Sequence, residues 1–166
     1  MSKIVATVSW SRQNQNFVDQ RYSRRHRWQF DGGLTVPASS SPHVVPIPYS
    51  DPSAMDPEEA FVASLSSCHM LWFLSLAAQQ GLCVESYEDQ AYGEMGTGGE
   101  GKTAILSVTL CPRVKWAATD NPDSETIAQL HHRAHQECFI ANSVKTDVRV
   151  QPVTTSFRAP AAEKSV

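Results

Sequence analysis

The sequence predicts one α+β domain built from antiparallel strand pairs and two helices. Residues 4–10 alternate between apolar and polar types, residues 60–78 form a mostly apolar run, and a glycine-rich segment at 96–101 separates two strand-like stretches. A chain of 166 residues is long enough for one hydrophobic core and short for two. We therefore expect residues 1–157 to form a single domain and residues 158–166 to be a disordered tail.

The N-terminal part of the chain predicts a β-meander. Hydrophobicity with a period of two indicates a strand over residues 4–10, and a second strand is expected over residues 21–30. Asp31-Gly32-Gly33 is a turn signal that closes the second strand. Six prolines from Pro37 to Pro57 oppose regular pairing, so this stretch should be an extended connection within the domain.

A long central helix is predicted from Asp56 to Gln80. Asp56 suits the N-cap, Pro57 suits the first turn, and Glu59 can complete a capping box, while Gly81 suits the C-cap. Nearly every face is apolar or small, so we expect protein to surround this helix. Serines, a cysteine and a histidine interrupt the middle of the run, which argues against a membrane span.

Two strands, a second helix and a last strand are expected after the central helix. The strands at residues 82–94 and 103–114 should form a hairpin in which Pro112 ends regular pairing. The last strand is expected at residues 146–155. Four apolar residues should share one face of the second hairpin strand: Ala104, Leu106, Val108 and Leu110. The second helix should begin at residues 121–125, and its apolar residues recur at helical spacing: Ile127, Leu130, Ala134 and Cys138.

Composition and charge exclude several classes of function. A net charge of −3 provides no general attraction to nucleic acid or to anionic lipid, and the first ten residues lack the apolar core of a secretion signal. We therefore expect a cytoplasmic protein with neither a nucleic-acid nor a membrane partner. Its four cysteines are too widely spaced for a CxxC zinc or redox motif, so free thiols are expected.

Residues 96–103, GTGGEGKT, match the phosphate-binding loop pattern GxxxxGK[ST]. That loop works between a buried strand and a helix N-terminus. Here a polar stretch precedes the pattern, and a β-branched stretch that ends at proline follows it. We therefore interpret the segment as a flexible hairpin tip and not as a nucleotide site.

Arg21, Arg24, Arg25 and Arg27 could suggest a basic surface that binds phosphates. Alternate strand residues face opposite sides, however, so the basic group would be divided between two faces. Arg25 and Arg27 should lie on a solvated face. Arg24 shares the other face with Trp28 and Phe30, so it should be partly buried and should need an anionic partner.

His131, His135 and Cys138 have the i, i+4, i+7 spacing that places two imidazoles and a thiol on one helix face. Such a set could bind zinc, but the helix supplies no fourth ligand. We favour a polar helix surface for the histidines and a core position for Cys138, and we expect no metal.

Cys68 lies in the middle of the apolar run, where the simplest interpretation is an inert buried thiol. A nucleophilic cysteine must be ionised near neutral pH, and a nearby guanidinium is the simplest means of stabilising the thiolate. Cys68 is too far from the predicted helix start for the helix dipole to help. If Cys68 is reactive, an arginine should activate it.

Three segments together resemble the OsmC/Ohr family of osmotically induced and organic hydroperoxide resistance proteins. They are DPEEAFVASLSSCHMLWFLSLAAQQG, RYSRRHRWQFDGG and AHQECFIANSV, and the similarity extends over about residues 3–155. The resemblance implies an α+β homodimer in which two long central helices are wrapped by antiparallel sheets. It also implies that each active site lies at the subunit interface.

The resemblance assigns roles to four residues. Cys68 matches the peroxidatic cysteine, Glu58 the glutamate ten residues before it, and Cys138 the resolving cysteine. Arg24 aligns with the activating arginine and would be held by a bidentate contact with Glu58. Cys68 would become a sulfenic acid that Cys138 traps as a disulfide. Cys83 and Cys111 have no counterpart in the motif and are expected to be structural.

The resemblance also implies the substrate and the reductant. Phe61, Leu65 and Trp72 lie near Cys68 in sequence and would favour alkyl or lipid hydroperoxides over hydrogen peroxide. No cofactor is expected, because a dithiol restores the thiols, and in relatives this reductant is often a lipoylated protein. The alternative is a non-catalytic or thiol-sensing member that binds a small apolar ligand at the dimer interface.

Overall fold

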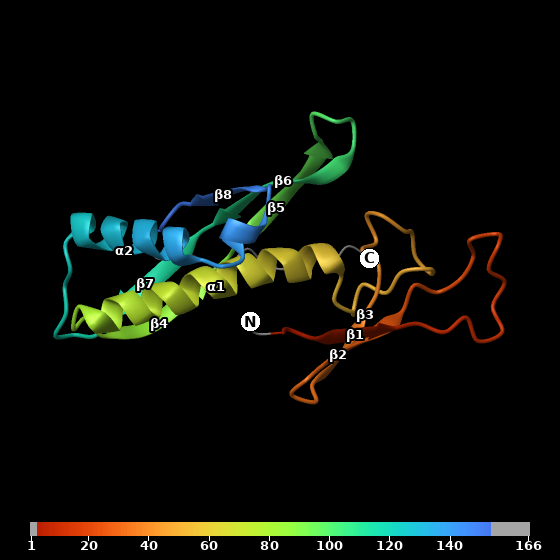
Figure 1. The fold of residues 1–166 in the computed structure, drawn as a ribbon, viewed down its shortest axis with the longest axis horizontal. Coiled ribbons are helices and arrows are strands. Elements are labelled where there is room, and N and C mark those ends of the chain that lie inside the picture. The colour runs from red at the N-terminus through yellow and green to blue at the C-terminus, as the bar shows by residue number, and fades with distance from the viewer. Residues whose placement is uncertain (1–2, 154–166) are drawn as a thin grey trace. The chain divides into compact units, whose positions relative to one another are not determined.

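The computed structural model describes residues 3–153 of the chain, which fall into two units. The N-terminal unit comprises residues up to Ser64, and the C-terminal unit begins at Leu65. Figure 1 shows the elements in chain order. The predicted tail at 158–166 lies outside the described residues.

A three-stranded antiparallel sheet forms in the N-terminal unit, and two of its strands were predicted. The third was not, because Pro37, which was expected to lie in the unpaired connection, pairs with Arg27 in this sheet. Strands β1 (Ala6–Ser9), β2 (His26–Phe30) and β3 (Thr35–Ala38) pair in the order β1-β2-β3. The turn at residues 31–33 is confirmed, because Gly33 has φ +86° and its N–H donates to the Phe30 carbonyl. The expected strand over residues 21–30 was too long, since the N–H of Arg24 instead donates to the carbonyl of Tyr49.

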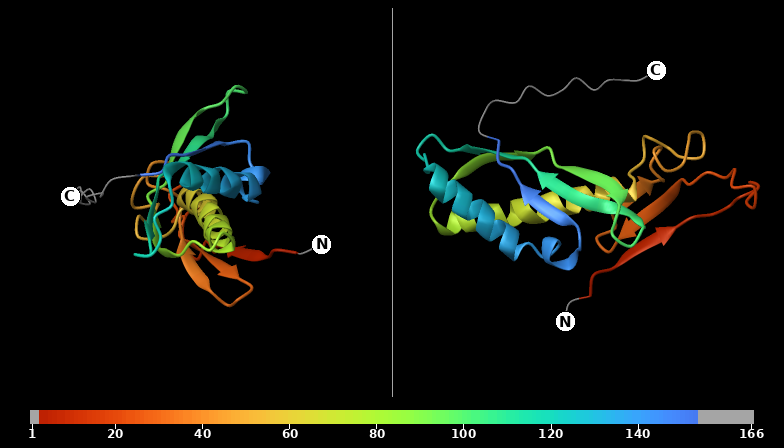
Figure 2. Two further views of the ribbon diagram at one scale, coloured as in Figure 1. Left: turned by 90° about the vertical axis from the view of Figure 1, so that its left-hand side faces the viewer. Right: turned by 90° about the horizontal axis from the view of Figure 1, so that it is seen from above.

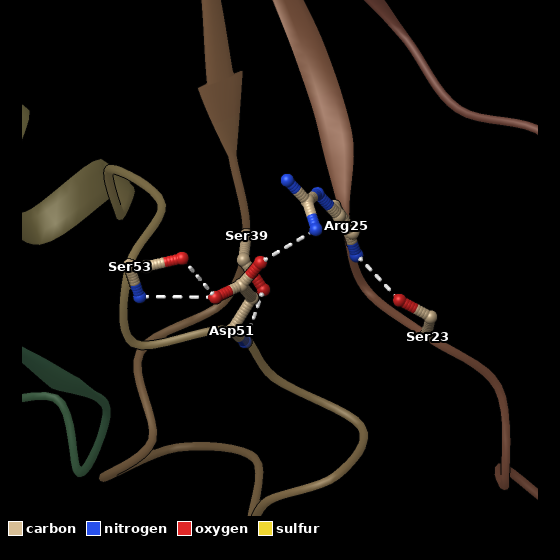
Figure 3. A network of polar contacts seen from close by, with 5 residues as sticks. All are labelled: Ser23, Arg25, Ser39, Asp51 and Ser53. Carbon is tan, nitrogen blue, oxygen red and sulfur yellow. Dashed lines mark hydrogen bonds and ion pairs between the residues drawn. The ribbon is translucent and has the colours of Figure 1, made fainter.

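Side chains fix the proline-rich connection that follows β3. Asp51 accepts hydrogen bonds from the N–H and Oγ of Ser53, as Figure 3 shows. It also forms an ion pair with Arg25, in which Oδ2 of Asp51 lies 3.1 Å from Nη1 of Arg25. The Asp51 N–H donates to Oγ of Ser39 at 3.0 Å, and the N–H of Arg25 donates to Oγ of Ser23 at 3.1 Å. The connection is therefore held against β2 and β3 without forming a ladder of its own.

Helix α1 (Pro57–Gln79) has the predicted ends. The N–H of Glu59 donates to Oδ1 of Asp56 at 2.8 Å, and the N–H of Asp56 donates to Oε2 of Glu59 at 3.3 Å, which is a capping box. Gly81 has φ +73° just beyond the C-terminus. By length and composition α1 is also a candidate membrane span, a test that core helices of soluble proteins pass as well.

The expectation that protein surrounds α1 is wrong for the single chain. One stripe of its C-terminal part is buried and consists of Leu65, His69, Phe73, Leu76 and Ala77. Leu71, which points elsewhere, is 61% exposed. The uniform apolar pattern of this helix therefore does not reflect burial on all sides within one chain.

The C-terminal unit contains two sheets where the sequence predicted one hairpin. Strands β4 (Val84–Asp89) and β7 (Pro112–Trp116) pair antiparallel, whereas β5 (Tyr92–Thr97), β6 (Thr103–Leu110) and β8 (Asp147–Val150) form a separate sheet. The hairpin tip at residues 98–102 is confirmed between β5 and β6. Strand β8 runs parallel to β6, because the chain returns to it through a helix.

Asp89 marks the point at which both predicted strands divide. Its Oδ1 accepts from the N–H of Cys111 at 2.6 Å, and its Oδ2 accepts from Oγ of Ser66 on α1 at 2.5 Å. Pro112 therefore begins β7 and does not end pairing. Leu106 is 42% exposed although it shares a strand face with buried Val108 and Leu110, so the predicted apolar face is buried at only one end.

Helix α2 (Ser124–Glu137) begins at the N-cap Asp123, which accepts from the N–H of Thr126 at 2.7 Å. It lies beside the C-terminal part of α1, as Figure 2 shows. The core between these helices consists of Phe73, Leu76, Ala77, Leu130 and Ala134. A short 3₁₀ helix, Ala141–Ser143, leads from α2 toward β8. This packing brings the end of α2 close to the middle of α1.

Candidate active site

Cys68 and Cys138, which are 70 residues apart in sequence, meet in the C-terminal unit. Cys138 is the C-cap of α2 and is 1% exposed, and its thiol lies close enough to Cys68 for the two side chains to interact. The N–H of Ala141 donates to Sγ of Cys138 at 3.4 Å and fixes its position. Both cysteines are free thiols, and Cys68 is half-buried.

The environment of this pair keeps the proton on Cys138. Burial, followed by the neighbouring Cys68 side chain, raises the pKa of the Cys138 thiol to about 11. Cys138 is therefore protonated at neutral pH and lies beside the Cys68 sulfur.

Two histidines are buried between α1 and α2. Nε2 of His69 lies 3.1 Å from Nδ1 of His131, and their rings are parallel within 4°. Burial lowers the pKa of His69 to about 3 and that of His131 to about 4, so both are neutral at pH 7. Sequence reasoning missed His69, although a histidine in an apolar helix is a signal that a buried polar partner is needed.

This pair changes the interpretation of the possible zinc ligands. His131 directs Nδ1 toward His69, so its first hydrogen-bond partner is another imidazole. Within residues 3–153, no group of three or more His, Cys, Asp or Glu side chains is arranged to hold a metal ion. The expected polar surface was wrong for His131, which is 4% exposed, and the expected core position was right for Cys138.

Arg24 and Glu58 line one pocket of the N-terminal unit, with a volume of about 460 Å³. The Arg24 guanidinium donates from Nη1 to the carbonyls of Gln20 and Tyr22, each at 2.6 Å, and lies 3.8 Å from the Tyr22 ring centroid. Oε2 of Glu58 is buried and has no hydrogen-bond partner among the described residues. Arg24 therefore contacts two backbone carbonyls and an aromatic ring, whereas the sequence predicted a carboxylate partner.

Neighbouring arginines have different partners in this unit. Arg24 lines the pocket, whereas Arg25, the next residue, pairs with Asp51 (Figure 3). Arg21 and Arg27 are exposed, as expected of a solvated face for Arg27. Within the described residues, the predicted bidentate contact between Arg24 and Glu58 is not formed.

The structure places the remaining candidate residues as follows. Phe61 is half-buried on α1, Leu65 has no exposed surface, and Trp72 packs edge-on against Phe139 with ring centroids 5.5 Å apart. Cys83 is exposed. Burial and the neighbouring Asp89 carboxylate raise the pKa of the Cys111 thiol. Neither of these two thiols is paired in a disulfide.

Residues 50–153 match the model of one protein family, described as OsmC-like protein. The chain belongs to the OsmC-like family. The match covers the cysteine pair, Glu58 and the whole C-terminal unit as far as it is described. The resemblance drawn from the three sequence segments is therefore confirmed at the level of the family and its mixed helix and sheet fold.

Solved structures of OsmC-like proteins share the fold of this chain. An OsmC-like protein of unknown function from Vibrio cholerae is 51% identical, with a TM-score of 0.90 over 92% of this chain and 100% of the other. Organic hydroperoxide resistance proteins from Elizabethkingia anophelis and Bacillus subtilis are 17% and 18% identical, with TM-scores of 0.67 and 0.63. Each match covers 92% of this chain, together with 94% of the Elizabethkingia anophelis protein and 98% of the Bacillus subtilis protein. A comparison with curated sequences gave no significant match.

Proposed function

We propose that this OsmC-like protein is a thiol-dependent peroxidase that reduces organic hydroperoxides to alcohols. The observation that supports the proposal is the proximity of the buried Cys138 thiol, whose pKa is raised, to the half-buried Cys68. In the proposed site Cys138 is the protonated resolving thiol and Cys68 is the sulfur that meets the substrate. The family includes organic hydroperoxide resistance proteins, which supports this chemistry.

The proposed cycle transfers two electrons. The Cys68 thiolate attacks one peroxide oxygen, the O–O bond breaks, and the alkoxide takes up a proton and leaves as an alcohol. Cys68 is then a sulfenic acid. The Cys138 thiol gives up its proton and attacks the Cys68 sulfur, so that an S–S bond forms, the S–O bond breaks and water leaves. A dithiol then reduces the disulfide and is itself oxidised to a disulfide.

The arrangement of α1 bears on where Arg24 and Glu58 act. Ten helical residues separate Glu58 from Cys68, which corresponds to a rise of about 15 Å along the helix. The two side chains of one helix are therefore too far apart to touch. We propose that the protein is a homodimer in which the pocket of Arg24 and Glu58 from one copy serves Cys68 of the other.

The proposal is tested by peroxide consumption with a dithiol such as dihydrolipoamide. The wild type should consume cumene and tert-butyl hydroperoxide repeatedly, Cys68→Ser should abolish turnover, and the exposed Cys83→Ser should serve as the matched control that retains it. A single oxidation without further turnover would favour a thiol sensor. Retained turnover in Cys68→Ser would exclude Cys68 as the nucleophile. The cycle needs reduced thiols, consistent with the proposed cytoplasmic location.

A further inference from the structure

Three aromatic rings form one wall of the pocket that contains Arg24 and Glu58. Phe17 and Tyr22 stack with centroids 4.6 Å apart, and Trp10 lies 5.7 Å from Phe17 and 5.4 Å from Tyr22. We call these three residues the aromatic wall. Phe17 is 47% exposed and Trp10 is 39% exposed, so the rings retain surface that a ligand could cover. None of these rings belongs to α1 or to the residues expected to contact substrate.

Hydrogen bonds hold the aromatic wall in place. The indole N–H of Trp10 donates to the carbonyl of Ser23 at 2.8 Å, and the N–H of Ser23 donates to Oε1 of Gln15 at 2.7 Å. Arg24 adds its two bonds to the carbonyls of Gln20 and Tyr22. The segment between β1 and β2 is thus tied at both ends and in its middle, which makes the wall a preformed surface.

The same pocket contains a hydrogen-bond acceptor and hydrogen-bond donors that have no partner among the described residues. Oε2 of Glu58 is buried without a partner, and Nε and Nη2 of Arg24 make no hydrogen bond to the described residues. His26 is fully used, because Nδ1 bonds the Arg24 carbonyl at 2.8 Å and Nε2 accepts from the Trp28 indole at 2.8 Å. A complementary head group must therefore both donate and accept a hydrogen bond.

We propose that the aromatic wall selects hydroperoxides whose tail carries an aryl ring. The –OOH head can donate to Oε2 of Glu58 and accept from Arg24, while a flat ring adjacent to the head covers Phe17 and Trp10. This inference rests on the proposed peroxidase function for its substrate. It assigns specificity to residues 10–22, separately from the thiol chemistry.

A matched pair of substrates tests the selection. Cumene hydroperoxide and tert-butyl hydroperoxide share a tertiary C–OOH head and differ by a phenyl ring in place of a methyl group. Phe17→Leu keeps an apolar side chain but removes a flat ring, so the ratio of kcat/KM for cumene over tert-butyl hydroperoxide should fall roughly three- to tenfold. Val18→Ala is the control, since Val18 is the next residue, is 95% exposed and should leave the ratio unchanged.

A binding measurement separates this inference from the proposed function. Calorimetric titration with 2-phenyl-2-propanol, the alcohol product, needs no turnover, and Phe17→Leu should weaken its binding by a similar factor while Val18→Ala should not. An unchanged substrate ratio with unchanged alcohol binding would overturn the role of the wall. If the wild type reduces neither peroxide, the peroxidase proposal fails. In that case alcohol binding that depends on Phe17 still supports an aryl site, and its absence refutes one.

Discussion

Nε2 of His69 lies 3.1 Å from Nδ1 of His131, and the other ring nitrogen of each residue is buried without a partner among the described residues. Phe73 stacks on His131 with centroids 4.3 Å apart, and after burial the charges of His131 and then of His135 further lower the pKa of His69. The contact between α1 and α2 beside the cysteine pair thus contains two imidazoles that the folded protein keeps neutral.

Acid should therefore destabilise the protein from pH 6.5 downward. The unfolded chain takes up protons below the ordinary imidazole pKa of 6.5, whereas the folded chain takes them up only near pH 3 to 4. The free energy of unfolding should fall by up to about 1.4 kcal/mol per pH unit for each ring in this window. Chemical denaturation between pH 7 and pH 5 measures the slope.

The His69→Leu/His131→Leu double variant should flatten that slope, because it removes both depressed imidazoles. His132→Gln is the matched control, since His132 lies on the same helix and is exposed. A double variant with the slope of the wild type would show that other groups cause the acid sensitivity.

Cys138→Ser should allow the first oxidation of Cys68 and then leave it unprotected. Without a resolving thiol, excess peroxide should convert the sulfenic acid to sulfinic and sulfonic acids. Mass spectrometry should detect two or three added oxygen atoms on the peptide that contains Cys68. The wild type under the same conditions should show a Cys68–Cys138 disulfide, and a disulfide from Cys68 to Cys83 or Cys111 would contradict the proposed pairing.

Substituting Arg24 should slow the oxidation of Cys68. Arg24→Gln removes the cation that we propose stabilises the thiolate and the developing negative oxygen, and the loss of one such donor typically costs about a hundredfold in rate. Rapid-mixing measurements of the first oxidation step give this rate. Arg21→Gln is the control, because Arg21 is exposed and lies outside the pocket. A larger effect at Arg21 would mean that the alignment with the family arginine is shifted.

Mixed dimers should distinguish a site within one chain from a site shared by two. Cys68→Ser retains Arg24, and Arg24→Gln retains Cys68, so a mixed dimer rebuilds one complete site only if the residues come from different copies. Random re-pairing of equal amounts should restore about a quarter of wild-type turnover. Refolding each variant alone is the control, and a mixture no more active than the average of the two would place Cys68 and Arg24 in the same chain.

Local signals explain which elements could be predicted from the sequence. The capping box of Asp56 and Glu59 and the glycine at position 81 depend on a few neighbouring residues, so the ends of α1 were predicted to within a residue. The hairpin tip around Gly101 was recognisable for the same reason. The division of the hairpin strands into two sheets was not, because it depends on the contacts of Asp89 with Ser66 and Cys111.

The sequence predicted which residues belong to the candidate site better than it predicted the contacts that these residues make. The sequence segments indicated both cysteines, and packing of α2 on α1 brings them together. The partners of Arg24 depend on the backbone carbonyls of Gln20 and Tyr22, which no spacing rule reveals. The pairing of His69 with His131 joins residues 62 positions apart and needs the folded core.

The two hydrogen bonds of Asp89 have a consequence for how this protein can vary among its relatives. One carboxylate bonds α1 at Ser66, two residues before Cys68, and it also bonds the backbone at Cys111, where the chain passes from one sheet to the other. Any residue that replaces Asp89 must accept hydrogen bonds from both Ser66 and the N–H of Cys111. Divergence at this position should therefore be accompanied by compensating changes at Ser66 or near Cys111.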